Sequence, residues 1–368
     1  MAGVLVHEWI AQDGGSENVL QAMSEAFPDA DVLCLWNDSV GRFDPARLRE
    51  SWLARTPLRR HKALTLPLMP AVWRNARYRG YDWALISSHA FAHHVRFRGA
   101  PPGFRRMVYV HTPARYVWTR AFDTRGDHPL ARAASRVLRP LDRRRAREGA
   151  EFAANSAFVR KRVHAAWGVD ARVIYPPVNV ERIQSVADWR EHLLPAESAL
   201  LESLPEGFLL GASRFIPYKR LEDVIGVGEA VDRPVVLAGK GPSLTALQEA
   251  ASTASVPVRF VTAPSEALLY ALYQQTALYV FPAVEDFGIM PVEAMAAGAP
   301  VLAQVEGGAA ESVVPGLTGA LISFGPVSEM REGVEQALAT VRADRLERAK
   351  AFGAGRFRDE IAAWVGGR

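Results

Sequence analysis

Residues 277–300 read ALYVFPAVEDFGIMPVEAMAAGAP. The first seven residues form an apolar run that favours a buried β-strand, and the acidic, glycine-containing segment behind it favours a loop. Proline has no amide hydrogen to donate and restricts the residue before it, so we expect a helix to begin at Pro291 rather than to run through it. This stretch therefore predicts a strand, a loop and a helix in succession.

The same succession recurs through the second half of the chain. Six apolar runs each precede a helical segment, and they read GFLLGAS (207–213), PVVLAGKG (234–241), VPVRFVT (256–262), ALYVFPA (277–283), PVLAQV (300–305) and GALISF (319–324). Six strand and helix pairs predict a parallel sheet covered on both faces. Right-handed crossovers then bring the carboxyl ends of the strands to one edge, where such sheets bind ligands.

The first half repeats this pattern less cleanly. Its candidate strands are GVLVHEWI (3–10), DVLCLW (31–36), DWALISSH (82–89), RMVYVHT (106–112), EFAANS (151–156) and ARVIYPP (171–177). The proline pair at 176–177 breaks regular structure, and we place a domain boundary there. We expect an α/β chain with two Rossmann-like, doubly wound parallel-sheet domains facing across a cleft. Residues 1–177 form the first domain and 178–350 the second, and a C-terminal helix in 351–368 packs back on the first.

Composition narrows the class of protein. The chain has 368 residues, 49% of them hydrophobic and 23% charged, which is ordinary for a globular protein. Its single cysteine, Cys34, excludes an internal disulfide framework and a cysteine-based zinc cluster. The first residues lack the basic start of a signal peptide, and no window offers the roughly 18 continuous apolar residues of a membrane span. We therefore expect a cytoplasmic protein.

One basic segment, ARAASRVLRPLDRRRAR (131–147), stands out from the formal net charge of +4. Arginines recur there at helical spacings of three and four, namely Arg132, Arg136, Arg139, Arg143 and Arg147. The stripe is typical of a solvated helix face. It also fits an anionic acceptor or an anionic membrane surface, which would place the protein peripherally at the inner face of the membrane. Nucleic acid is disfavoured because no aromatic residues interleave with the basic run.

Charged and glycine residues follow three of the predicted strands. Gly14 and Gly15 immediately precede a helix, where glycines permit a tight turn or the close approach of an anion such as phosphate. Arg214 and Lys219 stand before another helix, and two cations at its positive end leave a local charge that a diphosphate would neutralise. Glu285 lies in the loop of the opening stretch, and the carboxylates of Glu285 and Glu293 suit vicinal hydroxyls of a ribose or a sugar.

The sequence resembles a known family, the retaining nucleotide-sugar glycosyltransferases of family 4, which have the two-Rossmann-domain GT-B fold. The resemblance rests on eight motifs in order: HEWIAQDGGSENVL, YVHTPARYVWT, ANSAFVRKRV, VIYPPV, SRFIPYKR, LAGKGP, FPAVEDFGIMPVEAMAAGAPVLA and GGAAESV. It covers nearly the whole chain and is strongest toward the bacterial mannosyltransferase-like subgroup.

The resemblance implies roles for single residues. Arg214 and Lys219 match the pair that holds the donor diphosphate, and Glu285 matches the acid that contacts hydroxyls of the donor sugar. Glu293 matches the acid that binds the ribose. The remaining matches are Gly14 and Gly15, a glycine loop contacting the diphosphate; Phe287, Gly288 and Ile289, whose amides contact sugar and phosphate; and His111, which lines the sugar pocket near the reacting centre.

Two features depart from the family pattern, and one residue is ambiguous. Lys240 stands where an acid is usual, and FVTAPSEALLYALY lacks the glycine usual near the nucleobase, which leaves the base open. By pattern alone, His111 is more typical of a strand-end core histidine than of a ligand-binding one. The other histidines have no spacing that predicts a metal site.

The sequence therefore predicts a retaining, metal-independent hexosyltransferase with no cofactor. Its co-substrate would be a nucleoside diphosphate sugar, with GDP-mannose favoured over a UDP-hexose, and its acceptor a hydroxyl of a small molecule, a glycan or a lipid-linked glycan. Two alternatives stay open. The first is a glycoside hydrolase that uses Glu285 and Glu293 as its carboxylate pair. The second is a non-catalytic protein that binds sugar nucleotides.

Overall fold

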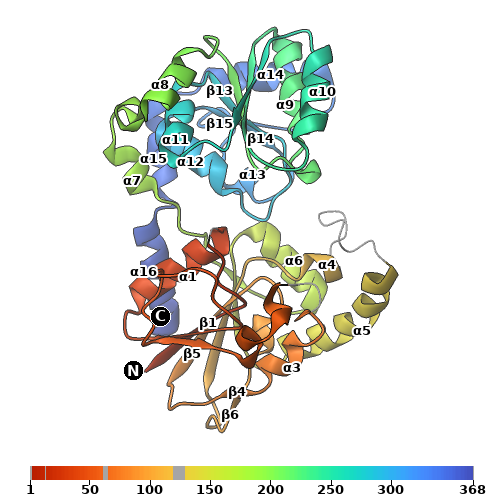
Figure 1. Cartoon of the computed structure of the whole chain (residues 1–368), viewed down its shortest axis with the longest axis vertical. Helices are drawn as coiled ribbons and strands as arrows, with labels where there is room; N and C mark the ends of the chain where they lie inside the picture. The colour runs from red at the N-terminus through yellow and green to blue at the C-terminus, as the bar shows by residue number, and fades with distance from the viewer. Residues whose placement is uncertain (1, 13, 61–64, 119–128, 368) are drawn as a thin grey trace. The chain divides into compact units, whose positions relative to one another are not determined.

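The computed structural model describes residues 2–12, 14–60, 65–118 and 129–367. The chain divides into two compact units, each with its own sheet. Unit 1 contains residues 1–177 and 355–368, and unit 2 contains residues 178–354 (Figure 1). Each unit is an α/β domain with a parallel sheet.

Unit 1 has a seven-stranded parallel sheet in the order β3-β2-β1-β5-β7-β8-β9. Its strands are β1 (Gly3–His7), β2 (Asp31–Cys34), β3 (Leu48–Glu50), β5 (Trp83–Ser88), β7 (Arg105–Val110), β8 (Glu151–Ala154) and β9 (Arg172–Val173). The short strands β4 (Ala76–Arg77) and β6 (Phe97–Arg98) pair separately. All six strands expected in this half are present, whereas the short β3, β4 and β6 were not predicted.

The helices of unit 1 cover both faces of this sheet. They are α1 (Gly15–Ala26), α3 (Met69–Trp73), α4 (Arg115–Trp118), α5 (Pro129–Ala146), α6 (Ala157–Trp167) and α16 (Ala354–Val365), with 3₁₀ turns η1 (Trp52–Arg55), η2 (Pro57–Arg60) and η3 (Ala92–His94). Alternate residues of β1 point to opposite faces, since Leu5 packs with α1 and α16, whereas Val4 and Val6 pack with α3 and α6. Figure 1 shows α1 beside α16 on one side of this unit.

Unit 2 has a six-stranded parallel sheet in the order β12-β11-β10-β13-β14-β15. Its strands are β10 (Leu209–Ala212), β11 (Val235–Gly239), β12 (Val258–Thr262), β13 (Leu278–Phe281), β14 (Val301–Gln304) and β15 (Gly319–Ile322). Its helices are α7 (Val180–Ser185), α8 (Pro195–Glu202), α9 (Glu222–Val231), α10 (Leu244–Thr253), α11 (Glu266–Gln275), α12 (Ile289–Ala297), α13 (Ala309–Ser312), α14 (Val327–Leu338) and α15 (Arg342–Lys350), with η6 (Trp189–His192) and η7 (Pro217–Lys219). The six predicted strand and helix pairs are confirmed.

The two faces of this sheet are covered by different helices. Helices α9, α10 and α14 contribute to one hydrophobic core, and α12 packs against α7, α11 and α15 (Figure 1). Helix α12 begins at Ile289, two residues before Pro291, so the expected start at Pro291 was wrong. The proline still lies in the first turn, where the amide hydrogen that it lacks has no partner within the helix.

Candidate functional site

The site in unit 2 lies where the strand order reverses. Strands β10 and β13 are neighbours in the sheet, yet β11 and β12 extend to one side and β14 and β15 to the other. The chain therefore leaves the carboxyl ends of these two strands in opposite directions, which is the point where doubly wound sheets bind ligands. Arg214 and Lys219 follow β10, and Glu285 follows β13.

Lys219 and Glu285 are brought into direct contact, 66 residues apart in sequence. The Lys219 ammonium group donates to a carboxylate oxygen of Glu285, and the side chains are only 7% and 18% exposed. Lys219 Nζ also lies 5.8 Å from the ring centre of Phe281, the last residue of β13. The two residues predicted to contact the same ligand thus lie together.

The charge around the start of α9 differs from the sequence-based expectation. Lys219 pairs with Glu285, and Arg220 pairs with Asp223 in the first turn of α9 at 2.6 Å. Arg214 is exposed, and its Nη2 donates to the Tyr218 hydroxyl at 3.0 Å. The protein itself therefore offsets much of the local positive charge, so a diphosphate is not required to explain these cations, although exposed Arg214 is accessible to one.

Glycines fix the loop between β13 and α12. The Gly308 amide donates to the carbonyl of Glu285 at 2.8 Å. A Cβ at Gly308 would lie 2.2 Å from the Asp286 carbonyl oxygen, so only glycine permits this close approach. Gly288 has φ +85°, a conformation that favours glycine, and no side chain caps the helix that starts after it. The helix start at Ile289 thus presents backbone amides, and Phe287 beside it is buried and packs on Phe352.

A second glycine pair fixes the loop that carries Arg214. The Phe215 amide donates to the carbonyl of Lys240 at 2.9 Å. A Cβ at Gly239 would lie 1.8 Å from the Ser213 carbonyl oxygen, and one at Gly241 would lie 2.3 Å from the Phe215 carbonyl oxygen. The segment GKG therefore serves as a backbone support for the Arg214 loop, a role that its sequence did not indicate.

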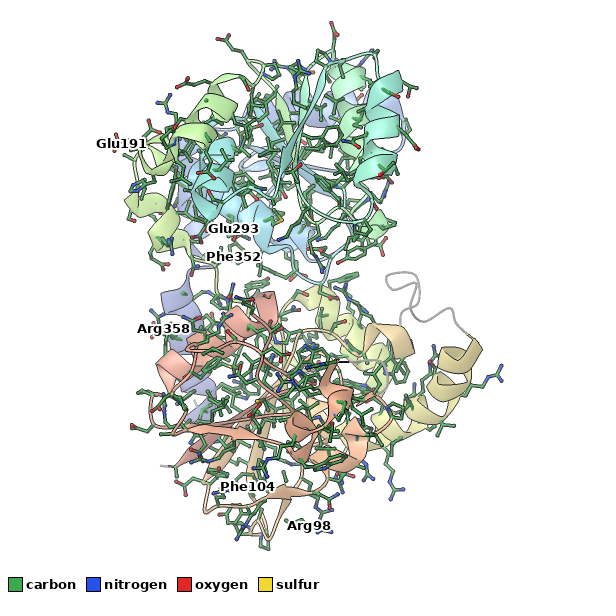
Figure 2. All side chains as sticks on the ribbon, viewed as in Figure 1. Arg98, Phe104, Glu191, Glu293, Phe352 and Arg358 are labelled. Carbon is green, nitrogen blue, oxygen red and sulfur yellow. The ribbon has the colours of Figure 1, made fainter. Side chains whose placement is uncertain are left out.

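Glu293 lies on α12, beyond its first turn, and is labelled in Figure 2. Burial and the nearby carboxylate of Glu266 raise its pKa from 4.5 to about 7. Glu266 itself pairs with Arg182 at 2.6 Å and accepts a hydrogen bond from Tyr270 at 3.1 Å. Sequence reasoning missed Glu266, although it stands in the segment near the expected nucleobase contact.

In unit 1, the glycine turn supports a buried carboxylate. Gly15 begins α1, and Glu17 in its first turn is only 3% exposed. Glu17 accepts hydrogen bonds from the Ala11 amide at 3.1 Å and the Ser16 hydroxyl at 2.7 Å. A Cβ at Gly14 would lie 2.1 Å from the Glu17 carboxylate. Gly14 therefore admits Glu17, so the tight-turn explanation of this glycine has direct structural support.

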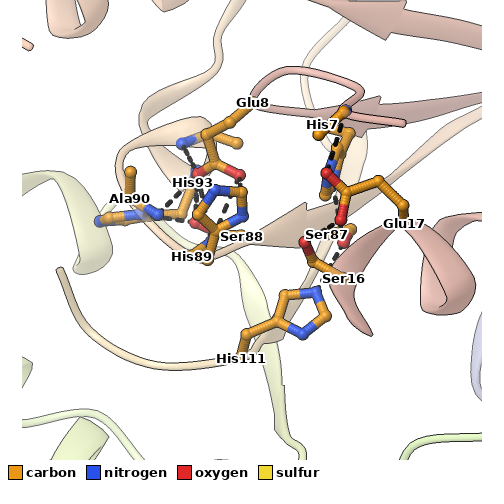
Figure 3. Close-up of polar contacts among 12 residues, drawn as sticks. His7, Glu8, Ser16, Glu17, Ser87, Ser88, His89, Ala90, His93 and His111 are labelled. Carbon is orange, nitrogen blue, oxygen red and sulfur yellow. Dashed lines mark hydrogen bonds and ion pairs between the residues drawn. The ribbon is translucent and has the colours of Figure 1, made fainter. Parts of the chain in front are cut away.

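His111 follows β7 and is partly exposed. Its Nε2 lies 2.8 Å from the Ser87 hydroxyl, which in turn lies 3.0 Å from Nδ1 of His7 (Figure 3). Burial, followed by the neighbouring His89 and His7, lowers the pKa of His111 well below its usual value. Sequence reasoning named His111 but missed both partners.

Glu8 anchors the loop after β5 (Figure 3). Its Oε1 accepts hydrogen bonds from the amides of Ala90 at 2.8 Å and Ala92 at 2.9 Å. Burial alone would raise its pKa, but His89, His7 and these amides lower the value to about 2. Glu8 is thus an ionised carboxylate enclosed by the loop that it holds.

A second buried carboxylate, Asp142 on α5, joins four side chains. Its Oδ1 lies 3.0 Å from Nε2 of His93 and 2.8 Å from Nε2 of His94, and its Oδ2 accepts the indole N–H groups of Trp118 and Trp167. Each carboxylate lies with two histidines whose potential ligand atoms are within 4.8 Å of one another and of the carboxylate. Since their oxygens are engaged by these hydrogen bonds, we assign the clusters to positioning of the loops and helices.

The arginine stripe on α5 largely contacts the protein itself. Arg139 donates from Nε to the Val117 carbonyl, Arg143 to that of Ala166 and Arg147 to that of Trp167, each at 2.8–2.9 Å. These carbonyls lie in the last turns of α4 and α6, where cations are favourable. Arg136 is exposed, and the side chain of Arg132 is outside the described residues.

Solved structures share this architecture. The chain aligns over its full length with Anabaena HepE in complex with UDP-glucose, with a TM-score of 0.68 and 18% identity. It also aligns over 99% of its length, and 98% of the other chain, with sucrose-phosphate synthase from Thermosynechococcus elongatus, with a TM-score of 0.70 and 19% identity. The fold is therefore the GT-B fold, as the sequence predicted.

Family models match both units. Residues 13–182 match the model described as Glycosyltransferase Family 4, and residues 198–353 match the model described as Glycosyl transferases group 1. The two matches together cover most of the chain. Each unit of the chain is thus similar to a glycosyltransferase family model.

Curated relatives match over shorter segments. One is the alpha-1,3/1,6-mannosyltransferase alg-2 of Neurospora crassa, 35% identical over 29% of this chain and 23% of the relative. Another is the GDP-mannose-dependent alpha-(1-6)-phosphatidylinositol monomannoside mannosyltransferase of Mycolicibacterium smegmatis, 29% identical over 51% of this chain and 52% of the relative. The chain thus spans about half the length, or less, of the curated relatives it matches. Every helix in the described ranges is too short or too polar to cross a membrane.

Proposed function

We propose that this protein is a retaining hexosyltransferase that moves a sugar, with mannose favoured, from a nucleoside diphosphate sugar to an acceptor hydroxyl. The observation that carries the proposal is the contact between Lys219 and Glu285 at the point where the strand order of unit 2 reverses. In such a site Lys219 would contact the diphosphate, and Glu285 beside it would contact the sugar. The glycosyltransferase models that match both units and the UDP-glucose bound by HepE support the same assignment.

The proposal assigns donor binding to unit 2. Arg214 and Lys219 would hold the diphosphate, because a guanidinium offers a fork of donors and an ammonium a point charge. Backbone amides at the start of α12, from Phe287 to Ile289, would receive sugar and phosphate oxygens. Glu285 would accept hydrogen bonds from sugar hydroxyls, and Glu293 from the ribose. In unit 1, Gly14 and Gly15 stay predicted contacts of the diphosphate.

The chemistry requires stabilisation of the departing diphosphate. Negative charge develops on the leaving phosphate as the bond to the anomeric carbon breaks, and preorganised donors act most strongly on such charge. Lys219, Arg214 and the helix amides are assigned this role in place of a metal ion. The new bond would form on the face that the diphosphate leaves, with the leaving phosphate accepting the acceptor proton. Neither carboxylate is then a nucleophile, and the pairing of Glu285 with Lys219 suits a binding role.

GDP-mannose leads as the donor because the mycobacterial relatives of this chain are named as dependent on it. UDP-hexoses come second, on the basis of the HepE complex. A lipid-linked acceptor would bring the protein to the inner face of a membrane. The exposed side chains of Arg136 and Arg144, together with that of Val137, which is 71% exposed, would then contact the membrane surface. Flotation with vesicles containing anionic lipid tests this contact, and recovery of the protein only in the dense fraction would oppose it.

The decisive experiment measures release of nucleoside diphosphate. Purified protein is incubated with GDP-mannose or UDP-glucose, with and without a panel of acceptors, after thermal-shift screening has identified the nucleotide that stabilises it. Acceptor-dependent release of the diphosphate together with an α-linked product supports the proposal. Cleavage of a glycoside without any nucleotide would establish the hydrolase alternative instead.

Variants separate catalysis from simple binding. Lys219→Ala should fold and lose most of its turnover, whereas Lys350→Ala, which removes an exposed lysine paired with Glu347, should retain it. Glu293→Gln should chiefly weaken donor binding, and Glu285→Gln should chiefly reduce turnover. Full turnover in Lys219→Ala would contradict the proposed site, and nucleotide binding without turnover in any condition would favour a non-catalytic protein.

A further inference from the structure

Three neighbouring strands of unit 1 end in a connected set of polar side chains. His7 ends β1, Ser87 lies near the end of β5, and His111 follows β7. The Ser87 hydroxyl lies 3.0 Å from Nδ1 of His7 and 2.8 Å from Nε2 of His111. His7 and Ser87 are fully buried, and His111 is partly exposed. Figure 3 draws both contacts as dashed lines. Ser87 therefore links a buried histidine to an accessible one.

The number of protons restricts how these contacts are made. Burial and neighbouring His89 lower the pKa of His7 to about 4, and the pKa of His111 is lowered well below its usual value. Both rings are therefore neutral near pH 7, and each carries one N–H. A hydroxyl has one proton, so Ser87 donates to one ring nitrogen and accepts from the other.

The buried face of His7 decides the direction. Nε2 of His7 is buried and has no hydrogen-bond partner among the described residues. Nε2 is unpaired in either tautomer, but a buried N–H without an acceptor is rarer and costlier than a bare ring nitrogen without a donor. A hydrogen bond between the His7 ring and the backbone of Ser87 also requires a ring N–H, which Nδ1 can supply. The favoured arrangement is therefore His7 Nδ1–H to Ser87 Oγ, and Ser87 O–H to His111 Nε2. His111 then carries its own proton on Nδ1.

We propose that Ser87 and His7 are positioning residues that fix the tautomer of His111, so that His111 presents an N–H donor from Nδ1 to an oxygen atom of the ligand. The inference rests on the proposed glycosyl transfer for its functional consequence. In this role His111 binds an oxygen of the sugar or its phosphate and does not remove a proton from the acceptor. Among the described residues, no other side chain hydrogen-bonds to the His111 ring.

The direct test is nitrogen NMR of the full chain. Protein labelled with ¹⁵N-histidine is studied near pH 7.5 without any sugar nucleotide, and the His111 signals are assigned by their loss in His111→Gln. We expect Nδ1 of His111 to be protonated in the wild type. In Ser87→Ala, we expect a shift toward protonated Nε2, the form that neutral histidine favours in water. Protonated Nε2 in the wild type, or an unchanged tautomer in Ser87→Ala, would overturn the proposal.

A matched variant controls for the loss of a buried hydroxyl. Ser88→Ala removes the next hydroxyl on the same strand, which contacts Glu8 and His93 but not His111. It should leave the His111 tautomer unchanged, while Ser87→Thr, which keeps a hydroxyl, should preserve the wild-type tautomer. Should Ser87→Ala fail to fold, His7→Phe removes the proton that orients Ser87 and should shift the tautomer in the same direction.

Kinetics add the functional consequence. Ser87→Ala should lower kcat by about tenfold, the effect of one misdirected hydrogen bond, and should have little further effect in a His111→Gln background. If Ser87→Ala lowered kcat by the same factor in the wild type and in His111→Gln, Ser87 would not act through His111. Because the tautomer is read in the free protein, an inactive protein with the expected tautomer refutes the proposed function alone. An active protein with the other tautomer refutes this inference alone.

Discussion

Replacement of Glu293 should make unit 2 more stable at alkaline pH. Glu293 has its pKa raised from 4.5 to about 7 by burial and by the carboxylate of Glu266. A raised pKa means that the folded state binds more protons than the unfolded state between these two values. Stability therefore falls as the pH rises through this window, and the full loss is present above about pH 7.

The size of the effect follows from the two pKa values. A pKa difference of about 2.5 corresponds to about 3 kcal/mol of folding free energy. Part of this loss is already present at about pH 5, because a glutamate in the unfolded chain is mostly ionised there. Between about pH 5 and about pH 8.5, the unfolding free energy of Glu293→Gln should therefore rise by roughly 2.5 kcal/mol relative to that of the wild type.

The assay must report on unit 2 alone. Pulse proteolysis in urea, with fragments of 178–354 identified by mass spectrometry, gives the unfolding free energy of this unit at each pH. The difference between variant and wild type cancels the titration of other groups. Glu266→Gln should raise the unfolding free energy at alkaline pH by less, because it removes only the negative charge next to Glu293 and leaves Glu293 buried. If the unfolding free energies of Glu293→Gln and the wild type changed in parallel with pH, the reasoning would be refuted.

Three further changes test single contacts. Gly308→Ala should abolish donor turnover and lower the thermal midpoint, because its Cβ would lie 2.2 Å from the Asp286 carbonyl oxygen. A Cβ at Gly226 would have no neighbouring atom within 4 Å, so Gly226→Ala should leave turnover intact and stabilise α9 by about 0.5–1 kcal/mol in urea unfolding. If Gly308→Ala and Gly226→Ala had the same effect, the packing argument would be contradicted. Asp142→Ala should destabilise unit 1 by about 3–5 kcal/mol in pulse proteolysis, since it leaves four donors, three of them on buried residues, without their acceptor, and a loss below about 1 kcal/mol would contradict this account.

The sequence predicted the sheets well because both are parallel and buried on two faces. Their strands are apolar runs with helices between them, a pattern that local sequence displays directly. The short edge strand β3 (Leu48–Glu50) was not predicted, since two half-buried residues and one exposed residue carry little apolar signal. The start of α12 was placed two residues late, because proline is accepted anywhere in a first turn and marks the beginning of a helix only approximately.

The candidate site was predicted in part. Strand ends could be read for Lys219 and Glu285, because the carboxyl edge of a parallel sheet gathers whatever follows its strands. Their direct pairing depends on which strands are neighbours, and only the reversal of order between β10 and β13 provides this. Ser87 and His7 were missed for the same reason, since a buried serine and a strand-end histidine carry no signal until the sheet order places them beside His111.

The path of the chain through unit 1 affects the order in which the protein forms during synthesis. Helix α16 buries Phe357, Ile361 and Trp364 in the core of a unit whose sheet is complete by residue 177. Unit 2 is therefore an insertion within unit 1, and its residues leave the ribosome before α16 does. Until then, one face of the first sheet is covered by α1 but lacks the contribution of α16, and transiently exposed apolar surface of this kind favours aggregation. The last helix thus acts as the closing step of assembly for the domain that was begun first.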